Sequence, residues 1–307
     1  MNQKQARPSE YQERKVRKKT PLKFTKMHGL GNDFIVIDDL SGRGFSARML
    51  KGDPSRKLCD RRFGVGADQI LVIGRASHKN ADARMDILNA DGSVAEMCGN
   101  GIRAVALYLK QHIFKRSRSL CIETLAGLKD VVFSGSSSHP MISVDMGKPI
   151  LSDDCTKGGA ALDLLHAGVA YLPGVMFFEV NIGNPHAVVF VNSVNNYPVD
   201  QVGPAIENHP RFPARTNVEF VEVNGPKSII VRVWERGAGL TLACGSGACA
   251  SAVAALCSGR VRGPSVNVNL PGGKLVIRWP GPGSSITMTG PAEEVFLGVV
   301  SKSGEYF

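Results

Sequence analysis

The sequence of 307 residues predicts an α+β fold made of two similar halves. Short segments rich in β-branched residues, punctuated by Gly, Pro, Asn or Ser, dominate the chain, and only a few stretches have helical periodicity. The pentapeptides MCGNG at 97–101 and ACGSG at 243–247 are nearly the same, about half a chain apart. The length is sufficient for two domains of ordinary size.

The expected strands are short apolar runs bounded by turn residues. In chain order they cover 22–29, 34–39, 69–74, 83–88, 120–127, 141–147, 175–183, 186–191, 217–223, 228–235, 266–271, 274–279 and 285–290.

Two segments between these strands have the periodicity of helices. The first begins near Gly99 and reaches about His112, with Ile102, Val105 and Leu109 on one stripe. The second begins near Gly245 and ends near Ser258, and its many alanines predict a helix packed closely on several sides. Shorter helices are expected at 46–62, 160–168 and 200–208.

Internal similarity extends beyond the two pentapeptides. A shift of 146 residues places Cys98 on Cys244 and Asn89 on Glu235, and a shift of about 150 places 29–33 on 181–185 and 61–68 on 210–217. Chance similarity among Gly-rich loops is the alternative, but the order of the segments is kept at a nearly constant offset. The sequence therefore predicts an N-terminal half of 22–143 plus 291–307 and a C-terminal half of 144–290.

Positive charge is concentrated at the N-terminus. Residues 1–23 hold eight Lys or Arg against Glu10 and Glu13, which accounts for +6 of the net charge of +10. Residues 1–21 are therefore expected to form a disordered basic leader, and the body carries no basic stripe that would indicate a nucleic-acid partner. No apolar run is long enough to span a bilayer and no secretory signal is visible, so a cytoplasmic protein without a membrane partner is expected.

Seven cysteines are present, at 59, 98, 121, 155, 244, 249 and 257, and no two form a C-x-x-C motif. Their number and spacing argue against a disulfide framework and against a metal site. The chain also lacks the Gly-rich motifs of nucleotide-binding loops and a lysine in a setting suited to a pyridoxal phosphate Schiff base. No cofactor is expected.

Cys98 and Cys244 are each expected at the start of a helix. The free N–H groups and the dipole there should lower the pKa of the thiol and bind a carboxylate. If the halves are related by an approximate twofold axis, the two thiols flank one anionic substrate. One thiolate could then remove the α-proton from one face of a carbon while the other thiol returns a proton on the opposite face, inverting the centre.

Five segments, in this order, resemble diaminopimelate epimerases. They are KMHGLGNDFIVID at 26–38, LNADGSVAEMCGNGIRA at 88–104, IGNPHAVVF at 182–190, RTNVEFV at 215–221 and WERGAGLTLACGSGACASAVAA at 234–255. The resemblance covers nearly everything from Lys26 to about Val300. It implies two pseudo-symmetric α+β domains, each a β-barrel-like sheet around a central helix. It also implies a cofactor-independent isomerase that interconverts LL- and meso-diaminopimelate, on the route to lysine and peptidoglycan.

The resemblance also implies roles for individual residues. Cys98 and Cys244 resemble the two catalytic bases, with His186 assisting a thiol and Glu235 handling the reacting ammonium or tuning a cysteine. Arg236 would bind a carboxylate. The remaining substrate-binding residues, which include Glu235 again, would be Asn32, Gln69, Asn89, Gly99, Asn100, Asn184, Asn217, Gly245 and Ser246. A homodimer is implied too, and Phe296 departs from a tyrosine common in the family, which bears on the dimer contact.

Other readings start from the same residues. Proline racemases and hydroxyproline epimerases also use two cysteines, but they place a His after the first Cys-Gly, where this chain has Asn100. A redox switch or a metal protein could use Cys98 with Cys244, although further ligands at suitable spacing are not evident. Taken singly, either cysteine would be read as a buried small apolar side chain.

Overall fold

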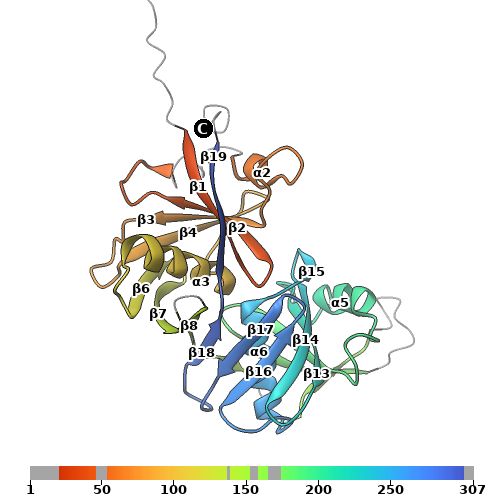
Figure 1. Ribbon diagram of the computed structural model, residues 1–307. Helices are drawn as coiled ribbons and strands as arrows, with labels where there is room; N and C mark the ends of the chain where they lie inside the picture. Colours follow the sequence, from red (N-terminus) through yellow and green to blue (C-terminus); the bar gives the residue numbers. More distant parts are fainter. Residues whose placement is uncertain (1–20, 46–53, 137–138, 153–157, 165–173, 301–307) are drawn as a thin grey trace, which may run out of the picture.

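The computed structural model describes residues 21–45, 54–136, 139–152, 158–164 and 174–300. Figure 1 shows two lobes, each dominated by β-strands. The helices are α2 (Pro54–Cys59), α3 (Gly99–Tyr108) with a π-helical turn η1 (Leu109–Ile113), α5 (Val199–Glu207) and α6 (Gly245–Cys257). Residues 1–20 of the expected basic leader lie outside the described residues.

The strands of the N-terminal half follow one another in space almost as they do in the chain. Their bounds are β1 (Leu22–Gly29), β2 (Asn32–Asp38), β3 (Gln69–Gly74), β4 (Ala83–Asn89), β5 (Val94–Ala95), β6 (Ser119–Thr124), β7 (Gly127–Gly135) and β8 (Pro140–Gly147). β1 pairs with β2, β3 with β4, β6 with β7 and β7 with β8, all antiparallel, whereas β2 with β3 and β4 with β6 are parallel.

The C-terminal half repeats this pattern. After β9 (Ile150–Leu151) and β10 (Ala160–Leu162) come β11 (Val175–Asn181), β12 (Pro185–Phe190), β13 (Asn217–Val223), β14 (Ser228–Glu235), β15 (Gly239–Thr241), β16 (Ser265–Leu270), β17 (Gly273–Arg278) and β18 (Ile286–Gly290). The pairs β12 with β13 and β14 with β16 are parallel, and the pairs β11–β12, β13–β14, β16–β17 and β17–β18 are antiparallel. The two halves therefore share one topology.

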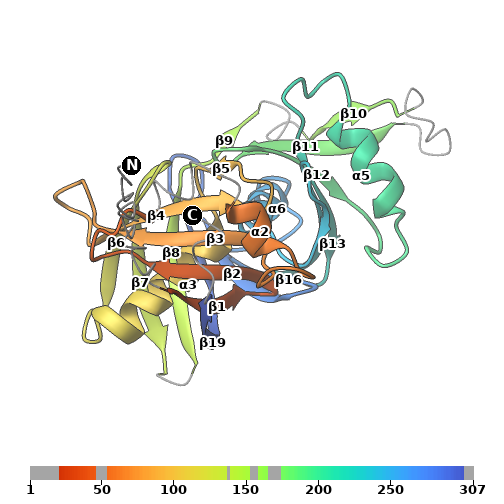
Figure 2. The ribbon, with the colours of Figure 1, turned by 90° about the horizontal axis from the view of Figure 1, so that it is seen from above.

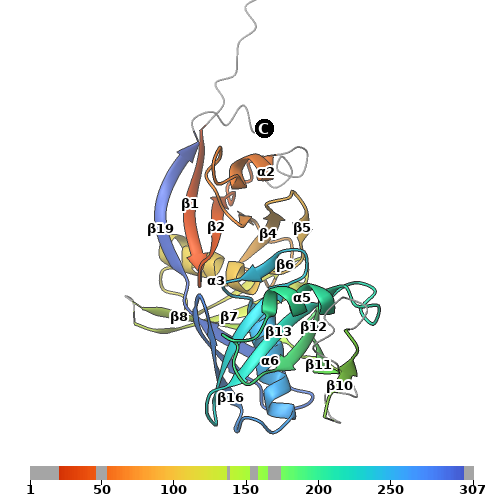
Figure 3. The same cartoon turned by 90° about the vertical axis from the view of Figure 1, so that its right-hand side faces the viewer.

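Strands also connect the halves. β8 pairs with β18, so the two curved sheets are continuous. The last strand, β19 (Glu293–Val300), leaves the C-terminal half and pairs with β1, as Figure 3 shows at the side of the molecule. The short β9 pairs with β11 in the same manner. Each half thus receives a strand that follows the other half in the sequence. The boundaries of the two halves expected from the sequence, near 143 and 290, stay a prediction.

Each long helix lies inside the sheet of its own half. α3 packs against β1, β2, β3, β6 and β8, and α6 packs against β11, β12, β13, β14, β16, β17 and β18. Figure 2 shows both helices within the curve of their strands. Because α6 is surrounded by strands, it is buried on nearly every side, which explains its small residues.

Most expected elements agree with the structure to within a few residues, including the helices at 99–112, 245–258 and 200–208. The helix expected at 160–168 is wrong at its start, because Ala160–Leu162 forms strand β10 beside β11, and residues 165–168 lie outside the described part. Of the helix expected at 46–62 the structure describes α2, since residues 46–53 lie outside the described part. The strand expected at 120–127 includes only the first residue of β7, and no strand is expected where β19 lies. No helix among the described residues is long and apolar enough to cross a membrane.

Candidate active site

Cys98 and Cys244 occupy the same position in the two halves. Each is the N-cap of its helix and has an extended backbone, with φ and ψ of −138° and 113° at Cys98 and −120° and 119° at Cys244. The Gly101 N–H donates to the sulfur of Cys98 at 3.3 Å, and the Gly247 N–H donates to the sulfur of Cys244 at 3.4 Å. The placement of both cysteines at helix starts is therefore confirmed.

The starts of α3 and α6 meet at the centre of the molecule. A Cβ built on Gly99 would lie 3.4 Å from the Cα of Gly245 and 3.0 Å from the Cε of Met288. A side chain at either glycine would crowd the other helix start and Met288, so this close approach favours glycine at both positions. The free N–H groups of both helices converge as a result.

Both cysteines line one cavity of about 910 Å³ between the halves. It gathers most of the predicted site residues, namely Asn32, Gln69, Asn89, Cys98, Gly99, Asn100, Asn184, Glu235, Arg236, Cys244, Gly245 and Ser246. Two predicted residues do not line it: His186 and Asn217 are buried behind its wall. The cavity is large enough for an extended small molecule.

The expected net lowering of the thiol pKa values is wrong, because both values are raised. Burial raises the pKa of Cys98 to about 11, although the N–H groups of Gly101 and Asn100 act in the opposite direction. The pKa of Cys244 lies well above its usual value, because burial is reinforced by the charges of Glu235 and Glu219. The loss of hydration on burial outweighs the effect of the helix N-terminus.

Glu235 ends strand β14 and is the carboxylate shared by both thiols. Burial raises the pKa of Glu235, while the neighbouring side chains of Thr241 and Cys244 lower it. Its charge also raises the pKa of Cys98. The charge of Glu235 therefore acts on both thiols.

On the N-terminal side, amide groups surround Cys98. Its sulfur lies 3.8 Å from Asn32 Oδ1, and Asn100 Nδ2 donates to the same oxygen at 3.3 Å. Asn32 Nδ2 donates to Asp68 Oδ2 at 2.8 Å, which fixes the orientation of the amide. The buried guanidinium of Arg103 donates to Asn100 Oδ1 at 2.9 Å and fixes that amide as well.

The other polar residues form two small groups. Gln69 Nε2 donates to Asn89 Oδ1 at 2.8 Å, and Gln69 Oε1 is buried without a hydrogen-bond partner. Asn217 accepts from the backbone N–H of Arg236 at 3.0 Å and donates to the carbonyl of Pro185 at 3.0 Å. Asn217 thus holds the segment that carries Arg236 and does not face the cavity.

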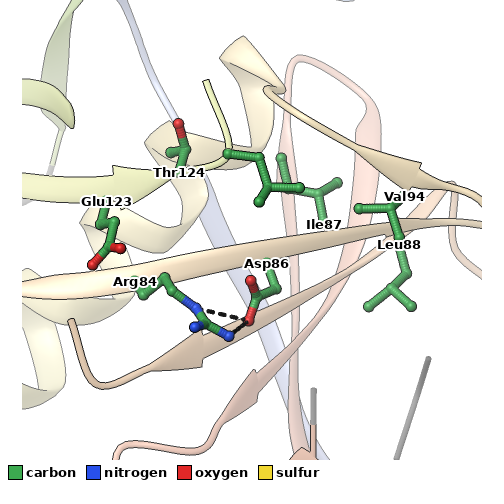
Figure 4. A pocket seen from close by; sticks show the side chains of 8 residues that line it. Arg84, Asp86, Ile87, Leu88, Val94, Glu123 and Thr124 are labelled. Atoms are coloured by element: carbon green, nitrogen blue, oxygen red, sulfur yellow. Dashed lines mark hydrogen bonds and ion pairs between the residues drawn. The ribbon is translucent and has the colours of Figure 1, made fainter. Parts of the chain in front are cut away.

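A second cavity, of about 290 Å³, lies over β4 and β6 (Figure 4). It contains none of the predicted site residues. Arg84 and Asp86 form an ion pair at 2.6 Å, and the Glu123 carboxylate accepts from the N–H groups of Ser77 and His78. Its charged groups are paired with one another or with backbone, whereas the cavity between the halves combines two thiols with open helix starts.

Sequence reasoning missed two carboxylates that support the site. Asp68 holds Asn32, and Glu219 contacts the ring of His186 at 2.7 Å. The sequence held an indication of Glu219, because a charged residue stands between the apolar Val218 and Phe220 in a strand whose first five residues are buried. Among the described residues, no group of three or more His, Cys, Asp or Glu side chains is placed to hold a metal ion.

Comparisons with known proteins agree with this geometry. The family model of diaminopimelate epimerase matches residues 24–152 and 178–295. The chain is 45% identical over 288 residues to the diaminopimelate epimerase of Carboxydothermus hydrogenoformans, covering 93% of this chain and 100% of the relative. It is 43% identical to that of Pseudomonas savastanoi pv. phaseolicola, covering 91% of this chain and 99% of the relative.

Solved structures share the fold at low identity. A hydroxyproline epimerase from Agrobacterium vitis matches with a TM-score of 0.69 at 18% identity, covering 91% of this chain and 92% of that one. A phenazine biosynthesis protein of the PhzF family from Bacillus anthracis matches with a TM-score of 0.68 at 15% identity, covering 92% of this chain and 99% of that one. These matches show a common two-domain α+β architecture.

Proposed function

The chain belongs to the diaminopimelate epimerase family and is an isomerase that converts LL-2,6-diaminopimelate to meso-diaminopimelate, and we propose that Cys98 and Cys244 carry out this reaction as two bases. The observation that supports the proposal is the pair of N-cap cysteines that open on one cavity from two related halves.

The reaction begins with one cysteine as thiolate and the other as thiol. The thiolate removes the α-proton from one face of the substrate carbon, and the pair of electrons moves into the adjacent carboxylate. The N–H groups of the two helix starts, at Gly99, Asn100, Gly245 and Ser246, stabilise the charge that develops there. The second thiol delivers its proton to the opposite face, so the two cysteines exchange protonation states and the centre is inverted.

The remaining residues hold the two amino-acid ends of the substrate. Arg236 binds a carboxylate, and Glu235 accepts a hydrogen bond from the reacting ammonium and exchanges a proton with Cys244. The amides of Gln69, Asn89 and Asn32 can accept from ammonium or donate to carboxylate. His186 and Asn217 act from behind the wall by holding residues that line the cavity.

The substrate assignment is tested by assaying LL-diaminopimelate and L-proline in parallel, with chiral chromatography of the products. We expect turnover of LL-diaminopimelate and a kcat/KM for proline lower by roughly 10³-fold or more, because a short substrate leaves the distal polar groups unpaired. Faster turnover of proline or hydroxyproline would contradict the assignment and favour a proline racemase or hydroxyproline epimerase.

We also infer a homodimer that forms along β19. This edge strand exposes apolar side chains on both faces, since Val295, Phe296, Leu297 and Val299 are each about half exposed or more. The ring centroid of Phe296 lies 6.1 Å from that of the buried Phe24 of β1, so Phe296 is packed on its own sheet as well as exposed. An exposed apolar edge strand favours association with a second copy. Sedimentation equilibrium should give twice the chain mass of 32.9 kDa, and a monomer would contradict the inference.

The same proposal places the protein in lysine and peptidoglycan precursor biosynthesis in the cytoplasm. A reducing compartment is required because two facing thiols would otherwise oxidise to a disulfide.

A further inference from the structure

His186 and Glu219 form a pair that touches neither thiol directly. His186 Nδ1 lies 2.7 Å from Glu219 Oε1, and both side chains are fully buried. Burying a titratable pair costs hydration free energy, which an apolar pair would not cost. The presence of such a pair beside an active site therefore calls for a functional reason.

The N-terminal half shows that the fold does not require a polar pair here. In the parallel pairing of β2 with β3, Phe34 lies opposite Gln69. In the parallel pairing of β12 with β13, His186 lies opposite Asn217. Phe34 is thus the counterpart of His186, and it is an ordinary buried core residue.

The partner position repeats the contrast. Leu71 stands two residues beyond Gln69 in β3, and Glu219 stands two residues beyond Asn217 in β13. A Cβ built on Gly101 would meet Leu71 at 3.2 Å, and a Cβ built on Gly247 would meet Glu219 Oε1 at 2.7 Å. Both side chains therefore lie against the third residue of the equivalent helix, one apolar and one acidic.

A chain of contacts leads from this pair to Cys244. His186 Nε2 lies 2.9 Å from Asn184 Oδ1. Asn184 Nδ2 lies 3.4 Å from Ser246 Oγ, which lies 3.5 Å from the sulfur of Cys244. Asn184 and Ser246 line the cavity, while His186 and Glu219 stay behind them.

The orientation of the Asn184 amide depends on the protonation of His186. Asn184 Oδ1 can accept a hydrogen bond from His186 only if His186 carries a proton on Nε2. The short contact between His186 Nδ1 and Glu219 Oε1 then needs a second proton, on one of those two atoms. Glu219 supplies the acceptor or the donor that this contact needs. Asn184 then donates to Ser246, whose hydroxyl hydrogen remains available to the sulfur of Cys244.

We propose that Glu219 is a positioning residue that, through His186, fixes the Asn184 amide and so gives the sulfur of Cys244 a hydroxyl donor. The sulfur of Cys98, by contrast, faces a hydrogen-bond acceptor. Asp68 holds the NH₂ group of Asn32, and the carbonyl oxygen of that amide faces Cys98. The two mirrored cysteines therefore differ in their hydrogen-bond surroundings. The proposal rests on the proposed function insofar as it concerns turnover.

The test gives the C-terminal half the apolar pair of the N-terminal half, in the double variant His186→Phe/Glu219→Leu. We expect kcat for LL-diaminopimelate to fall at least about tenfold while the melting temperature is kept or rises, since the pair is replaced by apolar residues of the same fold position. Glu222→Gln is the matched control, because it removes a charge from the same strand at a side chain that holds the N–H of Val194. It should retain wild-type kcat. Wild-type kcat in the folded double variant overturns the proposal.

A second variant needs neither turnover nor the double replacement. Asn184→Asp is isosteric, but its second oxygen should accept the Ser246 hydroxyl and turn it away from Cys244. Alkylation by iodoacetamide, followed by mass spectrometry across pH 7–10, should then show Cys244 reacting several-fold more slowly relative to Cys98 in the same sample, because its thiolate has lost a donor. An unchanged ratio overturns the proposal. Absence of epimerisation by the wild type would instead contradict the proposed function. The ratio of the alkylation rates of Cys244 and Cys98 would still test the role of the hydroxyl donor.

Discussion

Replacing either Cys98 or Cys244 by alanine is expected to lower epimerase turnover by at least about 1,000-fold while the fold is kept. Each variant removes the group that we propose acts on one face of the carbon, and a missing acid stops the reaction as fully as a missing base. The two losses should not add in the double variant, because both cysteines serve one proton exchange. Initial rates with LL-diaminopimelate, together with melting temperatures, measure the effect.

Cys249 provides the matched control. It lies in α6 beyond the turn that Cys244 caps, is fully buried, and does not line the cavity. Burial raises its pKa to about 12, so it stays a neutral thiol under assay conditions. Cys249→Ala should retain turnover within about threefold, with a modest loss of stability from the small cavity. Turnover above a tenth of the wild-type value in Cys98→Ala or Cys244→Ala would contradict the two-base assignment.

Replacing Glu235 by glutamine should lower kcat by about 100-fold and raise KM much less. The carboxylate raises the pKa of both thiols. Its removal should therefore lower both pKa values and move the alkaline rise of activity to lower pH, even though the maximum rate falls because Cys244 has lost its proton partner. A rise of activity at lower pH together with a lower maximum rate indicates a proton-transfer role, because a purely structural role would lower the rate without shifting the pH profile.

Rates over pH 6–10 provide that measurement. Glu179→Gln serves as control, since its carboxylate forms an ion pair with Arg211 and does not line the cavity. An unchanged maximum rate in Glu235→Gln would show that Glu235 contributes charge alone.

The sequence predicted the parts of the site that depend on local pattern. A cysteine followed by Gly-x-Gly and an apolar stripe predicts an N-cap, and both cysteines lie there. The offset of 146 residues anticipated that two helices would face one cavity, because repeated sequence implies repeated topology.

Other features depend on packing and could not be read from pattern. The direction of the thiol pKa shifts follows from how deeply each sulfur is buried, which no local motif specifies. The inward orientation of His186 depends on the pairing of β12 with β13, which brings Glu219 beside it. The strand at Ala160–Leu162 was missed because its partner β11 decides its conformation, and a short apolar segment is compatible with either state.

The account depends on two sulfurs acting from opposite faces of one carbon, and deuterium labelling tests this most directly. LL-diaminopimelate is incubated in deuterium oxide, and both epimers are analysed by mass spectrometry at low conversion. Two bases predict one deuterium at the inverted α-carbon of nearly every meso product, while the unreacted LL substrate keeps its protium. Transfer of the original protium into the product, as a single shuttling base would give, would contradict the account.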